Sequence, residues 1–138
     1  LGDVYKRQDY WLVLDHLGKP DIALGAKHWA QQIKPLAALG HVVCKLSGLI
    51  TEVPGGRWQA SQLLPFFDAA LEAFGPQRLM FGSDWPVCLL AGDYGQVYQL
   101  SEQAIATLSP SQQAEIWGGT ACRIYGLTES GYGSVSER

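Results

Sequence analysis

Three short apolar runs, each followed by a turn, constrain the fold of this chain more than any other feature. They lie at 10–15, 41–46 and 78–83, and the intervals between them show helical spacing of apolar residues. Continuous apolar runs of this length are typical of strands that are covered on both faces. Strands that alternate with helices form parallel sheets with right-handed crossovers. The sequence therefore predicts an α/β fold with a parallel sheet.

The expected helices lie between and after these strands. The first covers about 27–39, the second ends near Phe74 with Pro65 in its first turn, and the third covers about 94–108. A capping sequence from Ser109 to Gln112 begins a fourth helix, which we expect to end near Gly118–Gly119 before a short last helix.

Titratable side chains follow two of the expected strands. Asp84 ends the run at 78–83, and Trp85-Pro86 stops that strand at once; His16 ends the run at 10–15 beside a Gly/Pro turn. Active sites of parallel α/β folds gather at the C-terminal ends of strands, so we expect these two side chains to converge. Asp15 is expected to point to the opposite face from His16 and to have a structural role.

Two cations are further candidates for the same site. Lys45 lies inside the apolar run at 41–46, where a buried lysine needs a partner, and Ser47 shares its face by the two-residue period of a strand. Arg57 lies in the loop that follows this strand and is suited to hold an anionic or hydroxylated group. A lysine at the edge of the layer and a solvated loop arginine are the alternatives.

Composition excludes several classes of protein. The chain has 138 residues, 47% of them hydrophobic, a formal net charge of -3 and a pI near 5.5, so it is globular and has no basic stripe for nucleic acid. Its apolar runs are too short to span a membrane. The three cysteines are widely spaced and odd in number, which indicates a reducing cytoplasm rather than a disulfide framework.

The two ends differ from the rest of the chain. Residues 1–8 are polar and lack the periodicity of the strand after them, so we interpret them as a non-native leader. Residues 9–127 are the expected domain, and the Gly/Ser-rich residues 128–138 are expected to be a flexible tail.

Four segments carry a family resemblance. DHLGKP at 15–20, CKLSGL at 44–49, RLMFGSDWPV at 78–87 and RIYGL at 123–127 resemble the amidohydrolase-2 branch of the amidohydrolase superfamily, and most closely its lactonases. The family's His-x-His motif on the first barrel strand is absent, since the only histidines are His16, His28 and His41.

The resemblance implies a fold and a chemistry. The fold would be the C-terminal portion of a (β/α)8 TIM barrel, because a full barrel needs at least roughly 200 residues. The activity would be hydrolysis of a sugar or carboxylate lactone, a small-molecule substrate, by water that Asp84 activates, while His16 polarises the carbonyl. His16 and Asp84 match family positions that ligate a divalent metal such as zinc, although a metal-free mechanism also occurs in this branch. The alternatives are a non-oxidative decarboxylase of the same superfamily and an inactive fragment. The oligomeric state stays open.

Overall fold

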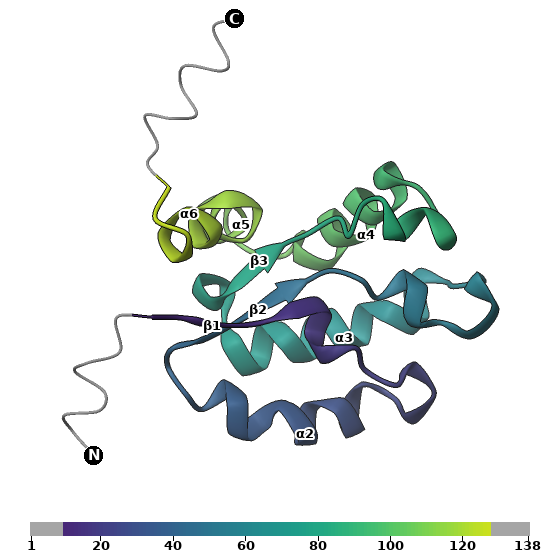
Figure 1. Ribbon diagram of the computed structural model, residues 1–138, viewed down its shortest axis with the longest axis horizontal. Helices are drawn as coiled ribbons and strands as arrows, with labels where there is room; N and C mark the ends of the chain where they lie inside the picture. The colour runs from purple at the N-terminus through teal and green to yellow at the C-terminus, as the bar shows by residue number, and fades with distance from the viewer. Residues whose placement is uncertain (1–9, 128–138) are drawn as a thin grey trace, which may run out of the picture.

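A three-stranded parallel sheet forms the centre of the molecule. The computed structural model describes residues 10–127, and its strands are β1 (Leu12–Leu14), β2 (Val42–Leu46) and β3 (Leu79–Phe81). They lie in the order β1-β2-β3, with Leu12 opposite Val42 and Cys44 opposite Leu79 (Figure 1). The predicted parallel α/β fold is confirmed.

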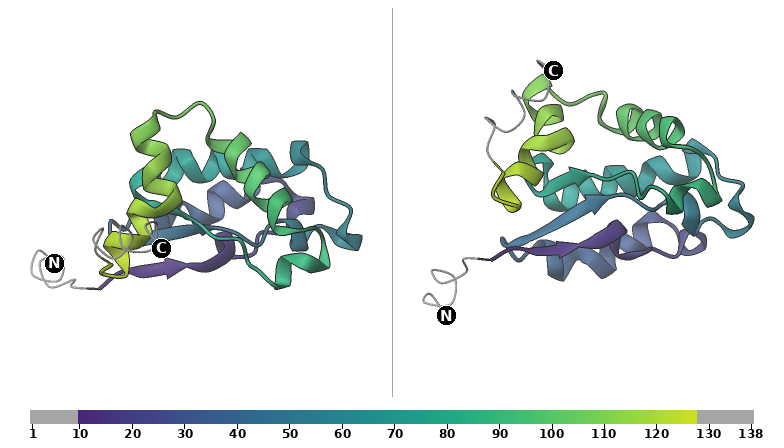
Figure 2. Two further views of the ribbon diagram at one scale, coloured as in Figure 1. Left: turned by 90° about the horizontal axis from the view of Figure 1, so that it is seen from above. Right: turned by 45° about the horizontal axis from the view of Figure 1, so that its top comes forward.

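Five α-helices accompany the strands within residues 10–127. Their bounds are α2 (Ala26–Ala37), α3 (Ala60–Phe74), α4 (Tyr94–Ile105), α5 (Pro110–Ala114) and α6 (Thr120–Ile124). Helices α2 and α3 lie side by side along the sheet, with Trp29 against Phe66, whereas α5 and α6 lie beyond β3 (Figure 2).

Two helix boundaries differ from the expectation. Pro65 lies inside α3 rather than in its first turn, because the helix begins at Ala60, where Gln62 Oε1 accepts a hydrogen bond from the Gln59 amide. The chain also stays helical past Gly118–Gly119, where a π-helical turn (Glu115–Gly119) connects α5 to α6. Thr120 supports this connection, since its hydroxyl donates to the carbonyl oxygens of Pro76 and Gln77.

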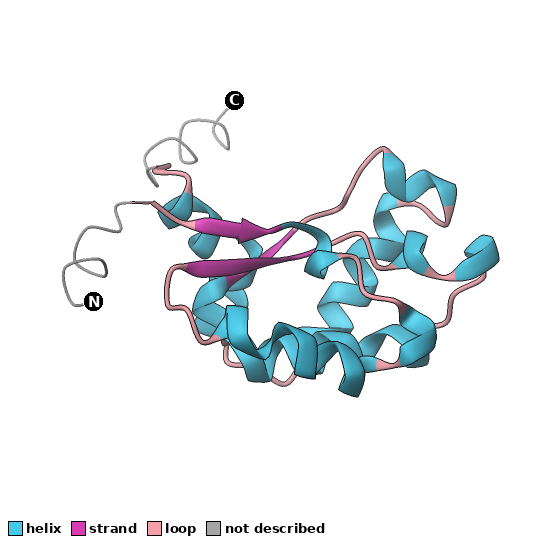
Figure 3. Cartoon of the chain, turned by 60° about the horizontal axis from the view of Figure 1, so that its bottom comes forward, coloured by secondary structure: helices cyan, strands magenta, loops and turns pink. Residues whose placement is uncertain are grey.

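The strands have two different faces. Val42, Cys44 and Leu46 belong to the hydrophobic core that the sheet shares with α2 and α3. These helices lie on one side of the strands in Figure 3. The alternate residues of β2, Val43 and Lys45, therefore face the other side, which is the inner face of a barrel.

One edge of the sheet carries exposed apolar side chains. Leu12 of β1 is 47% exposed, and Tyr10 and Trp11, which precede the strand, are 57% and 39% exposed. The outer edge of β1 has no neighbouring strand within the described residues. Among residues 10–127, no helix is long and apolar enough to cross a membrane.

Candidate active site

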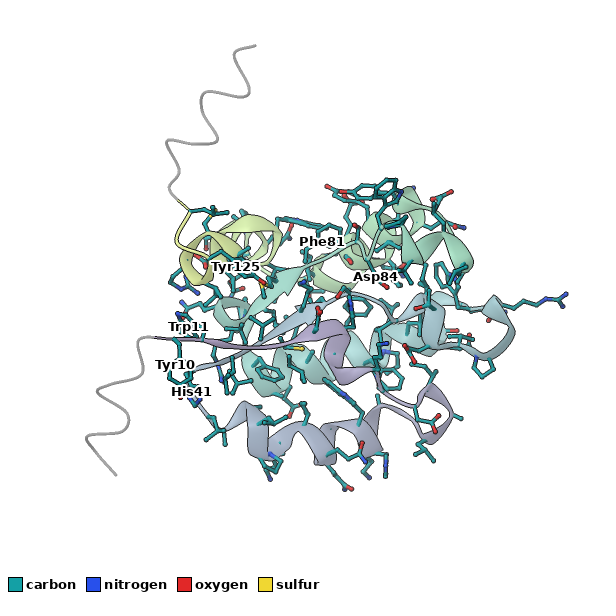
Figure 4. The ribbon with its side chains drawn as sticks, in the orientation of Figure 1. Tyr10, Trp11, His41, Phe81, Asp84 and Tyr125 are labelled. Carbon is teal, nitrogen blue, oxygen red and sulfur yellow. The ribbon has the colours of Figure 1, made fainter. Side chains whose placement is uncertain are left out.

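The three strands deliver polar side chains to the same end of the sheet. β1 ends at Leu14 and is followed by a 3-10 turn from Asp15 to Gly18; β2 is followed by Ser47, and β3 by the turn that holds Asp84. Because the strands are parallel, their C-terminal ends meet at one edge. Asp84 lies there, at the opposite end from Tyr10, Trp11 and His41 (Figure 4).

His16 and Asp84 are in contact. His16 Nε2 lies 3.4 Å from Asp84 Oδ1, and their side chains are 23% and 14% exposed. Both residues have positive φ angles, 51° for His16 and 57° for Asp84, a region that few side chains other than Asp, Asn and His adopt. The expectation that the two strand ends converge is confirmed, whereas the chemical roles of these residues stay predictions.

Ser47 and Gly48 hold the histidine ring from the other side. The Oγ atom of the buried Ser47 lies 2.7 Å from His16 Nδ1. Gly48 has a φ of +72°, and a Cβ atom built there would lie 2.9 Å from His16 Cβ. The two-residue period of a strand predicts that Ser47 lies on the same face as Lys45. Its contact with His16 could not be predicted from that period, because it depends on the fold.

Asp15 belongs to this cluster, and the expectation that it points away was wrong. Its Oδ1 lies 3.2 Å from Lys45 Nζ and its Oδ2 lies 3.6 Å from His16 Nε2. The strand ends at Leu14, so the strict alternation of sides stops there. The left-handed backbone of His16 then turns its ring back to the side of Asp15.

The two candidate cations, Lys45 and Arg57, have different surroundings in the structure. Lys45 reaches the site through its ion pair with Asp15, as an inward-facing lysine would. Arg57 is exposed at the end of a 3-10 turn (Pro54–Gly56), and no ion pair or side-chain hydrogen bond involves it within the described residues. His28 is exposed on α2 and His41 lies at the far end of the sheet, so neither is near Asp84.

The buried thiols are unsuited to nucleophilic chemistry. Burial raises the pKa of Cys44 to about 12. Burial also raises the pKa of Cys88, and the negative charge of nearby Asp84 adds to this shift. A thiol with a raised pKa stays protonated at neutral pH, and the thiolate is the nucleophile.

The donor set of His16 and Asp84 fits part of a zinc site. Tetrahedral zinc with Zn–N and Zn–O distances of about 2.0–2.2 Å holds two ligand atoms roughly 3.3–3.5 Å apart, and His16 Nε2 and Asp84 Oδ1 are 3.4 Å apart. Residues 10–127 contain no cluster of three or more His, Cys, Asp and Glu side chains that could hold a metal ion. These residues would therefore supply two ligands of a larger set.

The parallel strands with polar side chains at their C-terminal ends are typical of part of an α/β barrel enzyme, and sequence comparison identifies the family. The Amidohydrolase family model matches residues 8–127, so the chain belongs to this family. It is 53% identical over 131 residues to an L-fucono-1,5-lactonase of Burkholderia multivorans, covering 87% of the chain and 44% of the relative. An L-fucono-1,5-lactonase of Burkholderia ambifaria is 42% identical over 119 residues, which are 83% of the chain and 41% of that relative.

A solved structure supports the fold assignment. An amidohydrolase of Burkholderia multivorans, crystallised with bound zinc, superposes with a TM-score of 0.81 at 49% identity, over 92% of this chain and 48% of that one. The fold is that of part of a TIM-barrel amidohydrolase. The chain spans less than half the length of each of these relatives.

Proposed function

We propose that the protein containing this chain hydrolyses a sugar lactone, with His16 and Asp84 at the reacting carbonyl. The observation that carries this proposal is the 3.4 Å contact between His16 and Asp84 at the C-terminal end of the sheet. The names of two relatives, both L-fucono-1,5-lactonases, support a six-membered sugar lactone as the substrate class.

The chemistry assigned to Asp84 is proton transfer. Its carboxylate takes a proton from water as the water oxygen bonds to the lactone carbonyl carbon. The ring C–O bond then breaks, and the same carboxyl group returns the proton to the leaving ring oxygen. The product is a single open-chain hydroxy acid, and water is the only other reactant.

His16 has the complementary task. Negative charge develops on the carbonyl oxygen as water adds, and a polarising group at that oxygen lowers the barrier. The bond between His16 Nδ1 and Ser47 leaves Nε2 directed towards the site, where it stands beside Asp84. The ring is therefore oriented before substrate binds.

A divalent metal, for which zinc is the first choice, is part of this proposal. His16 Nε2 and Asp84 Oδ1 would hold it, and when bound it would polarise the carbonyl and lower the pKa of water. The bound zinc of the Burkholderia multivorans amidohydrolase supports this choice. A metal-free mechanism in which His16 acts directly is the alternative, and a chelator distinguishes the two.

Substrate recognition is assigned to the cations. Lys45, 3.2 Å from Asp15, is placed to hold a hydroxyl group or anion of the substrate at the site. Arg57 is a weaker candidate because its exposed side chain makes no contact with the cluster within residues 10–127. We also propose a cytoplasmic location, which the three free cysteines favour.

The test is steady-state hydrolysis by the complete protein. A panel of aldonolactones and carboxylated lactones is followed by acid release, with and without a chelator and added Zn²⁺. We expect turnover of six-membered sugar lactones that the chelator abolishes and Zn²⁺ restores. Release of CO2 from a carboxylated ring without lactone turnover would instead identify a decarboxylase. The 138-residue chain alone is expected to be inactive, because its described residues supply only two ligands.

A further inference from the structure

Asp15 and Lys45 form an ion pair at the edge of the site, and neither charge takes part in the proton transfer assigned to Asp84. Asp15 Oδ1 lies 3.2 Å from Lys45 Nζ, and the two side chains are 58% and 29% exposed. A pair this exposed contributes little to stability. Its position beside the reacting groups therefore points to contact with a ligand.

The ion pair lies directly beside the atoms assigned to the lactone carbonyl. Asp15 Oδ2 is 3.6 Å from His16 Nε2, and the same nitrogen is 3.4 Å from Asp84 Oδ1. Lys45 reaches Asp15 from the inner face of β2. A lactone carbonyl bound between His16 and Asp84 would therefore place the neighbouring ring carbons, C2 and C3 of a sugar, against this ion pair.

We propose that Asp15 is a specificity-determining residue that, together with Lys45, binds the hydroxyl groups on C2 and C3 of a neutral sugar lactone. Asp15 accepts a hydrogen bond from one hydroxyl group, and the Lys45 ammonium group donates to the other. The inference rests on the proposed function and narrows its substrate class, because it disfavours lactones that carry a carboxylate at these carbons.

A carboxylate and an ammonium group together match two neighbouring hydroxyl groups. A carboxylate only accepts hydrogen bonds and an ammonium group only donates them, whereas a hydroxyl group does both. One hydroxyl group can donate to Asp15 while its neighbour accepts from Lys45, so both charges keep a partner. Hydrogen bonds to an ionised group are stronger than those between neutral groups. The ion pair therefore favours a hydroxylated ring over an unsubstituted one.

The same ion pair disfavours an anionic substituent. The charge of Lys45 is balanced by Asp15, and within residues 10–127 no other lysine or arginine forms an ion pair with the carboxylates of the site. A substrate carboxylate on C3 would lie beside the carboxylate of Asp15, and like charges placed together oppose binding. A metal ion at His16 adds the same charge to the wild type and to an Asp15 variant, so comparing the two isolates the effect of Asp15.

The substrate preference of the complete protein tests this role. The value of kcat/KM is measured for a sugar lactone with hydroxyl groups on C2 and C3, for unsubstituted δ-valerolactone, and for δ-valerolactone with a carboxylate on C3. We expect the wild type to prefer them in that order. Asp15→Asn should lower kcat/KM for the hydroxylated lactone by about 10–100-fold and change that for δ-valerolactone by less than about threefold. It should raise kcat/KM for the carboxylated lactone by about tenfold, because the charge of Lys45 is no longer balanced.

Two further variants separate the contributions. Lys45→Met should lower the preference for the hydroxylated lactone without improving turnover of the carboxylated one, since it removes the only cation of the pair. Asp21→Asn makes the same chemical change as Asp15→Asn at an exposed position outside the site and is the control. Asp21 accepts a hydrogen bond from the Ala23 amide at 3.1 Å as a helix cap, and asparagine caps equally well. We expect Asp21→Asn to leave all kcat/KM values within about twofold of the wild type.

Equal losses on all of the lactones in folded Asp15→Asn would overturn the proposal, because they would show that Asp15 supports the shape of the site without contacting the hydroxyl groups. A wild type that prefers the carboxylated lactone would also overturn it. If Asp15→Asn does not fold, the wild-type order of preference and Lys45→Met decide.

Binding of a hydroxylated δ-lactam, which has N–H in place of the ring oxygen and resists hydrolysis, distinguishes this proposal from the proposed function. Its Kd is measured by calorimetry for the wild type and Asp15→Asn. Lactam binding that weakens in Asp15→Asn, in a protein that hydrolyses no lactone, would refute the proposed function alone. Lactone turnover together with unchanged lactam affinity in folded Asp15→Asn would refute the role of Asp15 alone.

Discussion

His16 Nε2 lies 3.4 Å from Asp84 Oδ1 although the two residues follow β1 and β3, which are not neighbours in the sheet. The contact passes over the end of β2, where Ser47 supports the His16 ring. Positive φ angles at both His16 and Asp84 direct their side chains to this point. The site therefore depends on the turns after the strands as much as on the strands.

Gly48→Ala tests how closely the backbone of β2 supports His16. A non-glycine residue in the left-handed region costs roughly 1–2 kcal/mol, and at Gly48 the added Cβ would also meet His16 Cβ at 2.9 Å. Gly55 has a similar φ of +76° with nothing within 4 Å of a built Cβ, so Gly55→Ala is the matched control. We expect the free energy of unfolding, from urea titration, to fall further in Gly48→Ala by at least about 1 kcal/mol. Equal decreases in the free energy of unfolding for the two variants would show that His16 moves away from the added Cβ atom without an energetic penalty.

The sequence predicts the positions of the strands and their parallel arrangement well, because each apolar run is followed by a turn that contains glycine or proline. Asp84 and His16 could be found in this way, since both are titratable groups placed directly after such runs. Asp15 could not, because the period of a strand does not extend into the 3-10 turn that begins at this residue. Ser47 could be placed on a face but not beside His16, since that contact depends on the packing of β1 on β2.

The buried thiol of Cys44 predicts a loss of stability in alkali. Its pKa is about 12 in the folded chain and near 9 when unfolded, so ionisation of the unfolded state begins first as the pH rises. The contribution of this thiol to the free energy of unfolding is therefore constant below about pH 9. Between about pH 9 and 12 the free energy of unfolding falls by up to about 1.4 kcal/mol per pH unit. Urea titrations at pH 8, 9.5 and 10.5 measure this, with Cys44→Ala as the reference. A pH dependence identical in wild type and Cys44→Ala would contradict the assignment.

Lys45 and Arg57 should differ in their effect on substrate affinity. Lys45→Met removes a cation 3.2 Å from Asp15 and keeps most of the side-chain volume, so we expect KM to rise by about tenfold or more. Arg57→Ala removes an exposed cation, and we expect less than about a threefold change. Steady-state kinetics on the preferred lactone compares the two. A larger effect from Arg57 would show that its loop closes over the substrate.

The exposed edge of β1 predicts association of the 138-residue chain on its own. Leu12 is 47% exposed on a strand whose outer edge has no partner among residues 10–127. Exposed apolar edges pair with other chains, and a lysine there opposes pairing. Sedimentation velocity should show concentration-dependent oligomers that Leu12→Lys reduces. A monodisperse monomer with a cooperative thermal transition would show that the chain needs no further strands.

Asp84 is proposed as the general base of a lactonase site, and Asp84→Asn tests this role most directly. The substitution keeps the size of the side chain and removes the base. Asp93→Asn is the control, because Asp93 caps α4 and asparagine caps a helix equally well. The measurement is kcat for sugar-lactone hydrolysis by the complete protein, with folding checked by circular dichroism. We predict a fall of about 10²–10⁴-fold in kcat for Asp84→Asn and near-normal turnover for Asp93→Asn. Near-normal turnover in a folded Asp84→Asn would show that Asp84 is not the general base.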